Sequence, residues 1–518
     1  MRNSGVISLH ETFVSVDIQE TEDDWRIFLR QGVGPADGSR LHRLLVHRIF
    51  EIDALLGKLI LRGKVVDVRV PKAIPESYSS LVADLIRPLL MERAFSEGLY
   101  GYQRQGVSWL LSHPKGILAD DMGLGKTAQT ICALRRLVRY GKSRWSLVVV
   151  PTSLTSNWMA EIHHWAPELV CQVVTPNKDE RKKVWQRASR TSHISITTYE
   201  HVRVASDHLS ELSPDVLIAD EAHRLRIDDS KVSQKFRALD SKYTWLLSGT
   251  PVENNRQDLA ILMSILEPNR FGTPDSQMHD DAFRSRVRPY ILRRTKEDVL
   301  PDLPPVVEKH EILDLLPRQR EAYNHELAGA TNQREFDRLA LFTRLRSICD
   351  CDPATGESSK INRIVEIVGD LIESNEKVVI FSYLLRPLEV LGTELARRGI
   401  KFESVTGQKS ETQRSESLFR FKAEEDVSVL LASMRVTSEG LTLTEASNVI
   451  FVNRWWNPSA NQQARDRVVR IGQKKTVQVI TLTCKNTVES RISEILENKS
   501  ITFDSLVNSL SEVPELFN

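Results

Sequence analysis

Short runs of apolar, β-forming residues recur along the chain, and they constrain its fold more than any other feature. In the first part of the chain these runs occupy residues 147–150, 194–197, 216–219 and 245–247. Runs of this length and composition are typical of strands buried on both faces of a parallel sheet. Helical stretches such as residues 128–140 lie between them. The pattern therefore predicts an α/β unit whose helices cover both faces of its sheet.

The same alternation returns nearer the C-terminus, in runs at residues 378–381, 427–431, 449–452 and 477–482. The interval before them opens with Pro301, Pro304 and Pro305 and then becomes charged and helical. We therefore predict the α/β class, with parallel-sheet lobes at 98–300 and 359–500, a helical connector at 301–358 and a C-terminal tail at 501–518. Apolar–polar alternation within residues 6–18 and 64–70 predicts strands of a small N-terminal α+β domain over residues 1–95.

Composition narrows the class of protein without identifying it. The 518 residues are 41% hydrophobic and 27% charged, which is ordinary for a globular chain of about three domains. No apolar run approaches the roughly 18 residues of a membrane span, and no apolar stretch follows Met1, so we expect neither a membrane partner nor a signal peptide. The five cysteines do not have the spacing of a zinc site, so we expect reduced thiols and no zinc.

The net charge of +1 gives no global signal for a polyanionic partner. Nucleic-acid binding needs only a local basic surface, and one basic cluster contains no acid. Its members are Arg284, Arg286, Arg288, Arg293, Arg294 and Lys296. From these residues alone, a nucleic-acid-binding patch and an ordinary solvated patch are equally good interpretations.

A glycine-containing segment between a short apolar run and a helical stretch predicts a phosphate-binding loop. Glycines let backbone N–H groups close around phosphate oxygens, and the helix N-terminus adds a positive partial charge. Lys126 would reach the β- and γ-phosphates, and the Thr127 hydroxyl would hold Mg²⁺. Asp120 stands where the strict pattern has glycine. The predicted wall of the loop is Asp121, Met122, Gly123, Leu124 and Gly125.

Two acids at the end of a strand complete the chemistry expected of a nucleotidase. Asp220 and Glu221 directly follow the apolar run at 216–219, 94 residues after Lys126 (220 minus 126). Asp220 would hold Mg²⁺, and Glu221 would orient and deprotonate the attacking water.

The order of these motifs resembles that of the helicase-like ATPases of superfamily two, and within them the Swi/Snf-type DNA translocases. The resemblance covers roughly residues 98–500. It includes an adenine-reading motif with Gln103, two DNA-strand motifs at 148–158 and 196–199, and a coupling motif at 247–255. It continues with a stretch that leads out of the first lobe at 291–305, the opening strand of the second lobe at 379–382, and the last motif from Trp456 onward.

The segment after Trp456 carries Gln463, Arg467 and Arg470 at i, i+4 and i+7, so on a helix they would share one face. Planar guanidinium groups suit the recognition of a polyanion, although a plain solvated helix face is the alternative. The resemblance implies that Arg467 and Arg470 are arginine fingers for the nucleotide.

The resemblance also implies two RecA-like lobes with ATP between them, Mg²⁺ as cofactor and double-stranded DNA as partner. The DNA contacts it implies are Thr152, Trp158, Thr198, Ser382, Ser433 and Trp456. The implied activity is movement along double-stranded DNA, driven by ATP hydrolysis, without extensive strand separation. An ATP-gated DNA clamp or scaffold and an RNA-directed helicase are the alternatives.

The resemblance leaves the biological setting open. Residues 1–95 are a candidate surface for a protein partner. We expect the protein in the cytoplasm, associated with the nucleoid, if its source is prokaryotic, and in the nucleus if it is eukaryotic. Two further features depart from the family pattern: the segment 433–443, with Thr437 and Ser438, stands where most members carry a double glycine, and Asn453 stands where the family is often acidic.

Overall fold

The computed structural model places most of the chain. It describes residues 12–21, 24–33, 44–45, 49–62, 66–69, 91–92, 94–175, 181–204, 212–225, 231–249, 256–268, 270–271, 280–299, 304–328, 335–434, 436, 442–455, 458–470 and 472–497. The chain divides into two compact units, Met1–Val299 and Leu300–Asn518. Each unit is described by itself.

The first unit begins with a small α+β region. Its sheet has the order β3-β2-β1-β4, in which β1 pairs antiparallel with β2 and parallel with β4. The strands are β1 (Thr12–Thr21), β2 (Asp24–Val33), β3 (Leu44–Leu45) and β4 (Val66–Arg69). Helix α1 (Ile49–Ile60) buries Leu56 and Ile60 in the same apolar cluster as Leu110 and Leu137 of the following lobe. The packing therefore continues without a break across the boundary expected near residue 95.

The following lobe is built on a parallel sheet of seven strands in the order β11-β5-β10-β9-β6-β8-β7. The strands are β5 (Lys115–Leu118), β6 (Ser146–Val150), β7 (Cys171–Val173), β8 (Ile194–Thr198), β9 (Val216–Ala219), β10 (Tyr243–Leu247) and β11 (Ile291–Leu292). Successive side chains enter two different apolar clusters, as for Val148 and Val149 on β6. Burial on both faces explains why these runs lack polar alternation.

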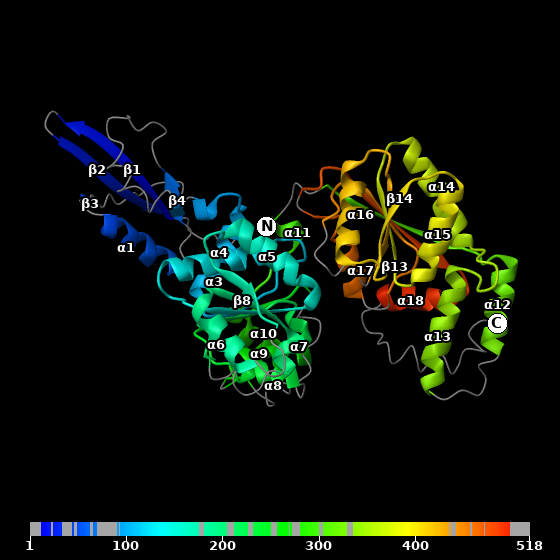
Figure 1. Ribbon diagram of the computed structural model, residues 1–518, viewed down its shortest axis with the longest axis horizontal. Helices are drawn as coiled ribbons and strands as arrows, with labels where there is room; N and C mark the ends of the chain where they lie inside the picture. Colours follow the sequence, from blue (N-terminus) through cyan, green and yellow to red (C-terminus); the bar gives the residue numbers. More distant parts are fainter. Residues whose placement is uncertain are drawn as a thin grey trace. The chain divides into compact units, whose positions relative to one another are not determined.

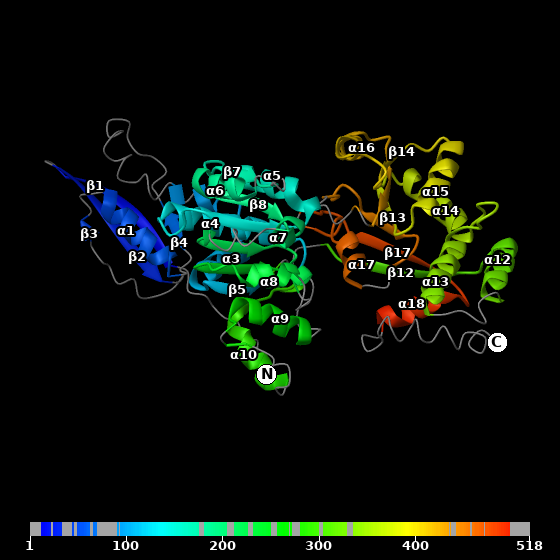
Figure 2. The same cartoon turned by 60° about the horizontal axis from the view of Figure 1, so that its bottom comes forward.

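Helices cover both faces of this sheet (Figures 1 and 2). One apolar cluster joins the sheet to α3 (Gly101–Ser112), α4 (Lys126–Arg139) and α5 (Thr155–Trp165). The other joins it to α6 (Arg181–Thr191), α7 (Tyr199–Val204), α8 (Lys231–Arg237), α9 (Arg256–Leu266) and α10 (Asp280–Val287). The unit ends with α11 (Lys296–Val299).

The second unit repeats this architecture with six parallel strands in the order β12-β17-β16-β13-β15-β14. The strands are β12 (Val306–Leu313), β13 (Val378–Ser382), β14 (Phe402–Val405), β15 (Val429–Ser433), β16 (Asn448–Phe451) and β17 (Val477–Cys484). Helices α14 (Ser359–Glu373) and α15 (Leu385–Arg397) cover one face, and α16 (Glu411–Ala423) and α17 (Pro458–Arg465) cover the other. A smaller cluster holds α12 (Pro317–Ala328), α13 (Glu335–Asp350) and α18 (Val488–Glu497).

The prediction of two parallel-sheet lobes after a small α+β region is confirmed. One part of the predicted organisation needs correction. The interval 301–358 was expected to be a helical connector, but it opens with β12, all 8 residues of which pair with β17. This strand lies at the edge of the sheet, and most of its side chains are exposed. Its sequence is therefore partly polar and did not indicate a buried strand.

Candidate nucleotide-binding site

The predicted phosphate loop connects β5 to α4 at the carboxyl end of the first parallel sheet. Gly123 and Gly125 have φ values of +84° and +74°, in the left-handed region that favours glycine. A Cβ atom on Gly125 would lie only 2.4 Å from Nε2 of Gln103. Helix α4 begins at Lys126, so the free amides of its first turn face the loop.

Lys126 lies on the loop itself. Its Nζ donates hydrogen bonds to the carbonyl oxygens of Asp120 at 2.7 Å and Asp121 at 3.2 Å. A Cβ atom on Gly249 would lie 2.5 Å from Cγ of Met122 and 3.1 Å from this Nζ, so the loop is closely packed. Helix amides, an ammonium group and the half-buried Thr127 form a donor set that fits a nucleoside triphosphate with Mg²⁺.

Three side chains fix the carbonyl group of Leu124 in this loop. The Tyr102 hydroxyl and the Gln103 Nε2 each donate to it at 3.2 Å, and the Gln129 Nε2 donates at 3.1 Å. The Oε1 atom of Gln103 also accepts from the Tyr100 amide at 3.0 Å. The expected adenine reader Gln103 is therefore brought to the loop by α3. Sequence reasoning missed Tyr102 and Gln129, although Gln129 is on α4 just after Lys126.

Asp120, the acid in place of the first glycine, is fully buried and accepts from several donors. Arg294 donates to both of its oxygens, with Nε 3.0 Å from Oδ1 and Nη2 2.5 Å from Oδ2. Gln129 Nε2 donates to Oδ2 at 3.1 Å. The basic cluster that includes Arg294 is thus not one surface: Arg294 points inward, whereas Arg286 and Arg288 are exposed.

Asp220 directly follows β9 and is 8% exposed. Its Oδ2 accepts from Nε1 of Trp158 at 2.7 Å, and its Oδ1 accepts from the Glu221 amide at 2.9 Å. Burial and the neighbouring Glu221 raise the pKa of Asp220 to about 6, against the opposing effects of the Trp158 hydrogen bond and the Lys126 ammonium. Because β5 and β9 both pair parallel with β10, the loop that follows β5 and the acids that follow β9 lie at the same edge of the sheet.

Glu221 has a φ of +51°, which is uncommon for a residue other than glycine. One carboxylate oxygen, Oε2, lies 3.2 Å from Nδ1 of His223. Left-handed backbone at a non-glycine residue is often found at functional sites, where the surrounding structure compensates for the strain. The motif predicted the position of this acid, but nothing in its sequence indicated this backbone conformation.

The predicted DNA contacts occupy two kinds of place. Thr152 is exposed in the 3-10 turn Thr152–Leu154, with its hydroxyl 3.3 Å from Oε2 of Glu200. Trp158 is fully buried, and its Nε1 donates a hydrogen bond to Asp220. The side chains of Thr198, Ser382 and Ser433 are buried at strand ends, and their role as DNA contacts stays a prediction. Trp456 lies outside the described residues.

The predicted helical face of Gln463, Arg467 and Arg470 is wrong. Helix α17 ends at Arg465, and the chain then turns. The carbonyl of Arg467 accepts from the Leu443 amide at 2.8 Å, and Gly472 has a φ of +101°, so the helix does not continue. Arg470 remains half-buried, with Nη1 3.2 Å from the Thr442 hydroxyl oxygen. All of these residues belong to the second unit.

A buried polar network in the second unit accounts for Asn453. Its Nδ2 donates to Asp350 Oδ2 at 2.5 Å and to Ser382 Oγ at 3.0 Å, and its Oδ1 accepts from the Tyr383 amide at 2.8 Å. The buried Lys360 ammonium donates to Asp350 at 2.8 Å and to Glu489 at 2.5 Å. A carboxylate at position 453 could not donate to Asp350 and would repel it.

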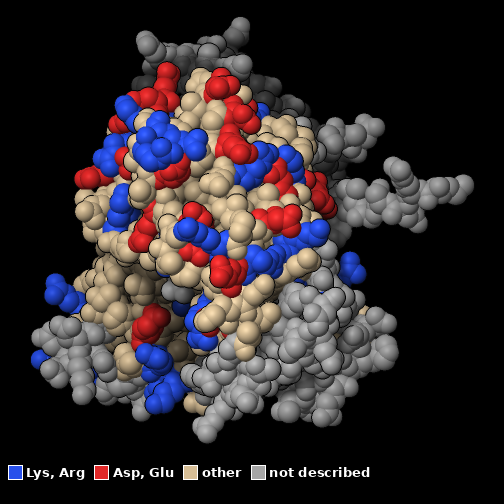
Figure 3. All heavy atoms as spheres, turned by 90° about the vertical axis from the view of Figure 1, so that its right-hand side faces the viewer, with Lys and Arg blue, Asp and Glu red and all other residues tan. Residues whose placement is uncertain are grey.

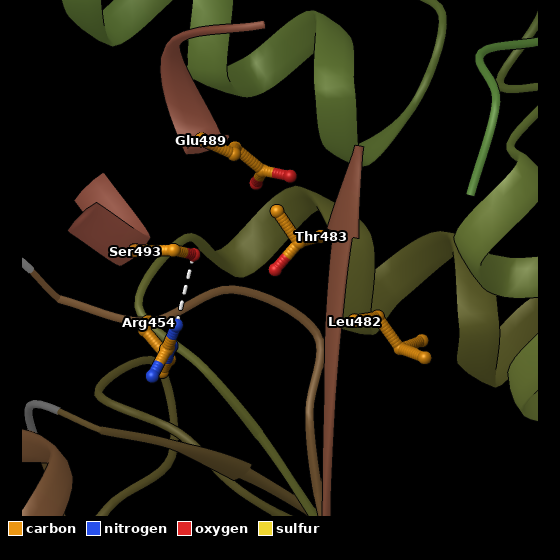
Figure 4. Close-up of a pocket in the computed structure, with 5 residues that line it drawn as sticks. All are labelled: Arg454, Leu482, Thr483, Glu489 and Ser493. Carbon is orange, nitrogen blue, oxygen red and sulfur yellow. Dashed lines mark hydrogen bonds between the residues drawn. The ribbon is translucent and has the colours of Figure 1, made fainter. Parts of the chain in front are cut away.

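Glu489 also lines a small pocket with Arg454, Leu482, Thr483 and Ser493, where Arg454 donates to Ser493 at 2.9 Å (Figure 4).

Possible ligand atoms of Cys349, Cys484 and Glu489 lie within 4.8 Å of one another. Both Glu489 oxygens are already in use, one by Lys360 and the other by the Cys484 amide at 2.9 Å. Burial raises the pKa of the Cys349 thiol well above its usual range, so we assign this group a packing role.

Acidic and basic side chains are interspersed over the described part of the face shown in Figure 3. None of the described helices has the length and apolar character needed to cross a membrane.

Two parallel-sheet lobes, with a glycine loop and a strand-end acid pair in the first, define the class of two-lobed helicase-type proteins. The SNF2-related domain family matches residues 102–371, and the helicase conserved C-terminal domain family matches residues 359–472. Because the first match covers more than half of the chain, the protein belongs to the SNF2-related family.

Its relatives include bacterial and animal proteins. An uncharacterized ATP-dependent helicase of Mycoplasma pneumoniae is 29% identical over 513 residues, which cover 93% of this chain and 49% of the relative. A mouse SWI/SNF-related matrix-associated actin-dependent regulator of chromatin, subfamily A member 1, is 32% identical over 453 residues, covering 79% of this chain and 43% of the relative. The chain thus spans about half the length of these curated relatives or less.

A search of solved structures finds the Sulfolobus solfataricus SWI2/SNF2 ATPase core in complex with double-stranded DNA. It is 28% identical, with a TM-score of 0.41, and the match covers 81% of this chain and 95% of that chain.

Proposed function

We propose that the chain is a DNA-dependent ATPase that couples ATP hydrolysis to movement along double-stranded DNA without extensive strand separation. The observation that carries this proposal is that the loop with Lys126 follows β5 and the acids Asp220 and Glu221 follow β9, so both lie at the carboxyl end of one parallel sheet. Ligands in open α/β sheets bind at this edge. Family membership supports the proposal, since relatives are named as ATP-dependent helicases and chromatin-remodelling ATPases.

The first unit would bind the triphosphate. Lys126 would exchange the two carbonyl oxygens that it now contacts for phosphate oxygens, and the amides at the start of α4 would hold the remaining ones. Thr127 and Asp220 would hold Mg²⁺, which when bound neutralises charge on the phosphates. Glu221 would orient the attacking water and accept its proton. Gln103, on the far side of the loop, would read the adenine.

The second unit would supply Arg467 and Arg470, with Gln463 beside them. An arginine that neutralises charge on the transferring phosphoryl group can raise turnover by about 10³–10⁵-fold. The groups that would bind phosphate and the arginines lie in different units of the chain. We therefore propose that hydrolysis requires both units, which is how it would drive motion.

DNA would be held through its phosphates. Thr152 is exposed in a turn that directly precedes α5, and its hydroxyl would exchange the Glu200 carboxylate for a phosphate oxygen. Contacts of this kind position a protein on the duplex without reading its sequence. Affinity for DNA should therefore fall steeply as salt concentration rises.

Two substitutions test the ATPase directly. Lys126→Ala and Glu221→Gln should each abolish DNA-stimulated ATP turnover, whereas Lys142→Ala, at an exposed lysine of the same unit, should not. Full turnover in either site variant would refute the proposal. Displacement of a third strand from a DNA triplex, measured with and without ATP, then separates a translocase from a clamp that binds DNA without travelling.

A further inference from the structure

Trp158 connects the turn that carries Thr152 to the acid at the end of β9. We propose that Trp158 is a positioning residue that holds the Asp220 carboxylate for the metal–nucleotide complex, and that it links this carboxylate to the DNA-contacting turn. The inference rests on the proposed function and deepens it, because it assigns a role to a residue outside the phosphate loop and the acid pair.

The hydrogen bond between the two residues is short and buried. The indole Nε1 lies 2.7 Å from Oδ2 of Asp220, across 62 positions of sequence. Trp158 is fully buried, and Asp220 is 8% exposed. Hydrogen bonds to a charged acceptor are among the strongest in proteins, and a buried one is not weakened by competing water. The indole therefore exerts a strong orienting force on this carboxylate.

The other contacts of Asp220 leave its side-chain orientation to Trp158. The Oδ1 atom accepts from the amide of Glu221, the next residue, and the Tyr199 hydroxyl donates to the main-chain oxygen of Asp220 at 2.6 Å. The terminal torsion of an aspartate is broad, so a local amide alone defines it poorly. Of the two groups among the described residues that donate to this carboxylate, the indole is the one that comes from a different element, α5.

Helix α5 gives the contact a second consequence. Trp158 lies in its first turn, and the helix directly follows the 3-10 turn that exposes Thr152. Leu154 and Ile162 fix this segment in the same apolar cluster as Trp158. A shift of the turn would therefore move the indole donor. Contact of Thr152 with DNA would then shift Trp158, and the shift of Trp158 would change the position of the Asp220 carboxylate.

Indole NMR signals give a test that does not depend on catalysis. The chain contains nine tryptophans, so ¹⁵N labelling of tryptophan yields a spectrum of few signals. Trp158→Phe identifies the Trp158 signal by its loss. We expect this signal far downfield, as for a donor to a carboxylate, and we expect it to move when Mg²⁺ and ADP are added and again when a DNA duplex is added. A signal at an ordinary shift that responds to neither would overturn the proposal.

Metal affinity gives the second readout. The Mg²⁺ concentration that half-saturates binding of a fluorescent ADP analogue should rise about tenfold in Trp158→Phe, as for other residues that orient metal ligands. Affinity for the analogue without Mg²⁺ should stay within about twofold, because the phosphate loop is unchanged. Replacement of Trp158 by 3-benzothienylalanine, which keeps the ring shape but has sulfur in place of N–H, should have the same effect without disturbing the packing.

Trp185→Phe is the matched control. Trp185 is 1% exposed in the same unit, and its Nε1 has no hydrogen-bond partner among the described residues. Its substitution should change neither Mg²⁺ dependence nor the Trp158 signal. Wild-type Mg²⁺ dependence in the benzothienylalanine variant would overturn the positioning role even if the wild-type protein hydrolyses ATP. A Mg²⁺ effect in a protein without DNA-stimulated turnover would uphold the positioning role and refute the proposed function.

Discussion

Arg294 binds Asp120 through two guanidinium nitrogens, although the residues are 174 positions apart. The Asp120 side chain is fully buried, and that of Arg294 is 11% exposed. The main chain runs alongside this ion pair: the Ala119 amide donates to the Leu292 carbonyl at 2.7 Å, and the Asp121 amide donates to the Arg294 carbonyl at 2.9 Å. The start of the phosphate loop is therefore fixed by the segment that ends the first unit.

Loss of this arginine should be costly. Arg294→Met would leave the Asp120 carboxylate buried without its partner, and we expect the free energy of unfolding to fall by about 3–5 kcal/mol. Urea unfolding measures the change. Adding Asp120→Asn to Arg294→Met should recover part of the loss, since the uncompensated charge is gone. Lys242→Met breaks an exposed pair with Asp215 and should cost less than about 1 kcal/mol. Equal losses in the two single variants would contradict the argument.

Gly125 can be tested against a glycine with the same backbone strain. Gly125→Ala should weaken nucleotide binding by about tenfold or more. The new methyl group would lie 2.4 Å from Gln103 Nε2 and would push this side chain away from the loop. Gly141 has a φ of +65°, and no atom lies within 4 Å of the place that a Cβ would occupy. Gly141→Ala should therefore lower stability only by the cost of left-handed backbone at alanine, about 1–2 kcal/mol. Titration with a fluorescent nucleotide and urea unfolding separate the two effects. Nucleotide binding that is unchanged in Gly125→Ala would contradict the proposed clash with Gln103.

Arg470 is predicted to act in hydrolysis and not in binding. Arg470→Ala should retain ATP affinity within a few-fold and lose about 10³-fold or more in turnover. Arg397, an exposed partner of Glu394, gives the control Arg397→Ala, which should behave as wild type. Single-turnover hydrolysis with equilibrium binding makes the distinction. Normal turnover in Arg470→Ala would show that the residue is not an arginine finger.

The ion pair between Glu311 and Arg363 predicts a pH dependence of stability. Hydrogen bonds from Arg363 hold the pKa of Glu311 at about 2, below the roughly 4.3 of an unfolded glutamate. A lowered pKa stabilises the fold above about pH 4.3, and this contribution is lost as the pH falls toward 2. Glu311→Gln should cost about 1 kcal/mol at pH 7 and progressively less below pH 4.3. Glu366, the more exposed partner of Arg363, provides the control Glu366→Gln. A Glu311→Gln effect that is constant with pH would exclude this ion pair as its source.

Gly57 on α1 lies where a side chain would not fit. A Cβ atom there would be 2.9 Å from the ring of Tyr140, so Gly57→Leu should lower stability by about 1–3 kcal/mol through overpacking. Gly369 is also helical, but nothing lies within 4 Å of its Cβ position, so Gly369→Leu should be tolerated. Thermal unfolding compares the two variants. If Gly57→Leu is as stable as wild type, α1 does not pack against α4 in solution.

The sequence revealed the interior of each sheet better than its edges. Residues 147–150 and 378–381 were recognisable because strands buried on both faces must be apolar. In the two parallel sheets, four strands were not predicted: β7, β11, β12 and β14. They are the two edge strands of the seven-stranded sheet and the two edge strands of the six-stranded sheet. An edge strand has one paired neighbour and more exposed side chains, so its sequence carries a weaker signal.

The candidate site shows the same division between local and distant information. Lys126, Thr127, Asp220 and Glu221 could be located because each lies in a short motif at a predictable place in an α/β unit. The contacts of Trp158 with Asp220 and of Arg294 with Asp120 join distant segments, and no local periodicity encodes them. The i, i+4, i+7 pattern of Gln463, Arg467 and Arg470 failed because α17 ends at Arg465, and the Arg467 carbonyl instead accepts a tertiary hydrogen bond from the Leu443 amide.

Helix α4 gives the N-terminal region a direct route to the nucleotide. Lys126 starts this helix of 14 residues, and near its other end Arg139 binds Asp53 of α1 at 2.7 Å. A rigid helix of this length transmits displacement over about 20 Å. A force applied to α1 therefore acts on the far end of the element that would hold the phosphates. The ion pair of Asp53 with Arg139 therefore places the N-terminal region on the same helix that begins at the phosphate loop.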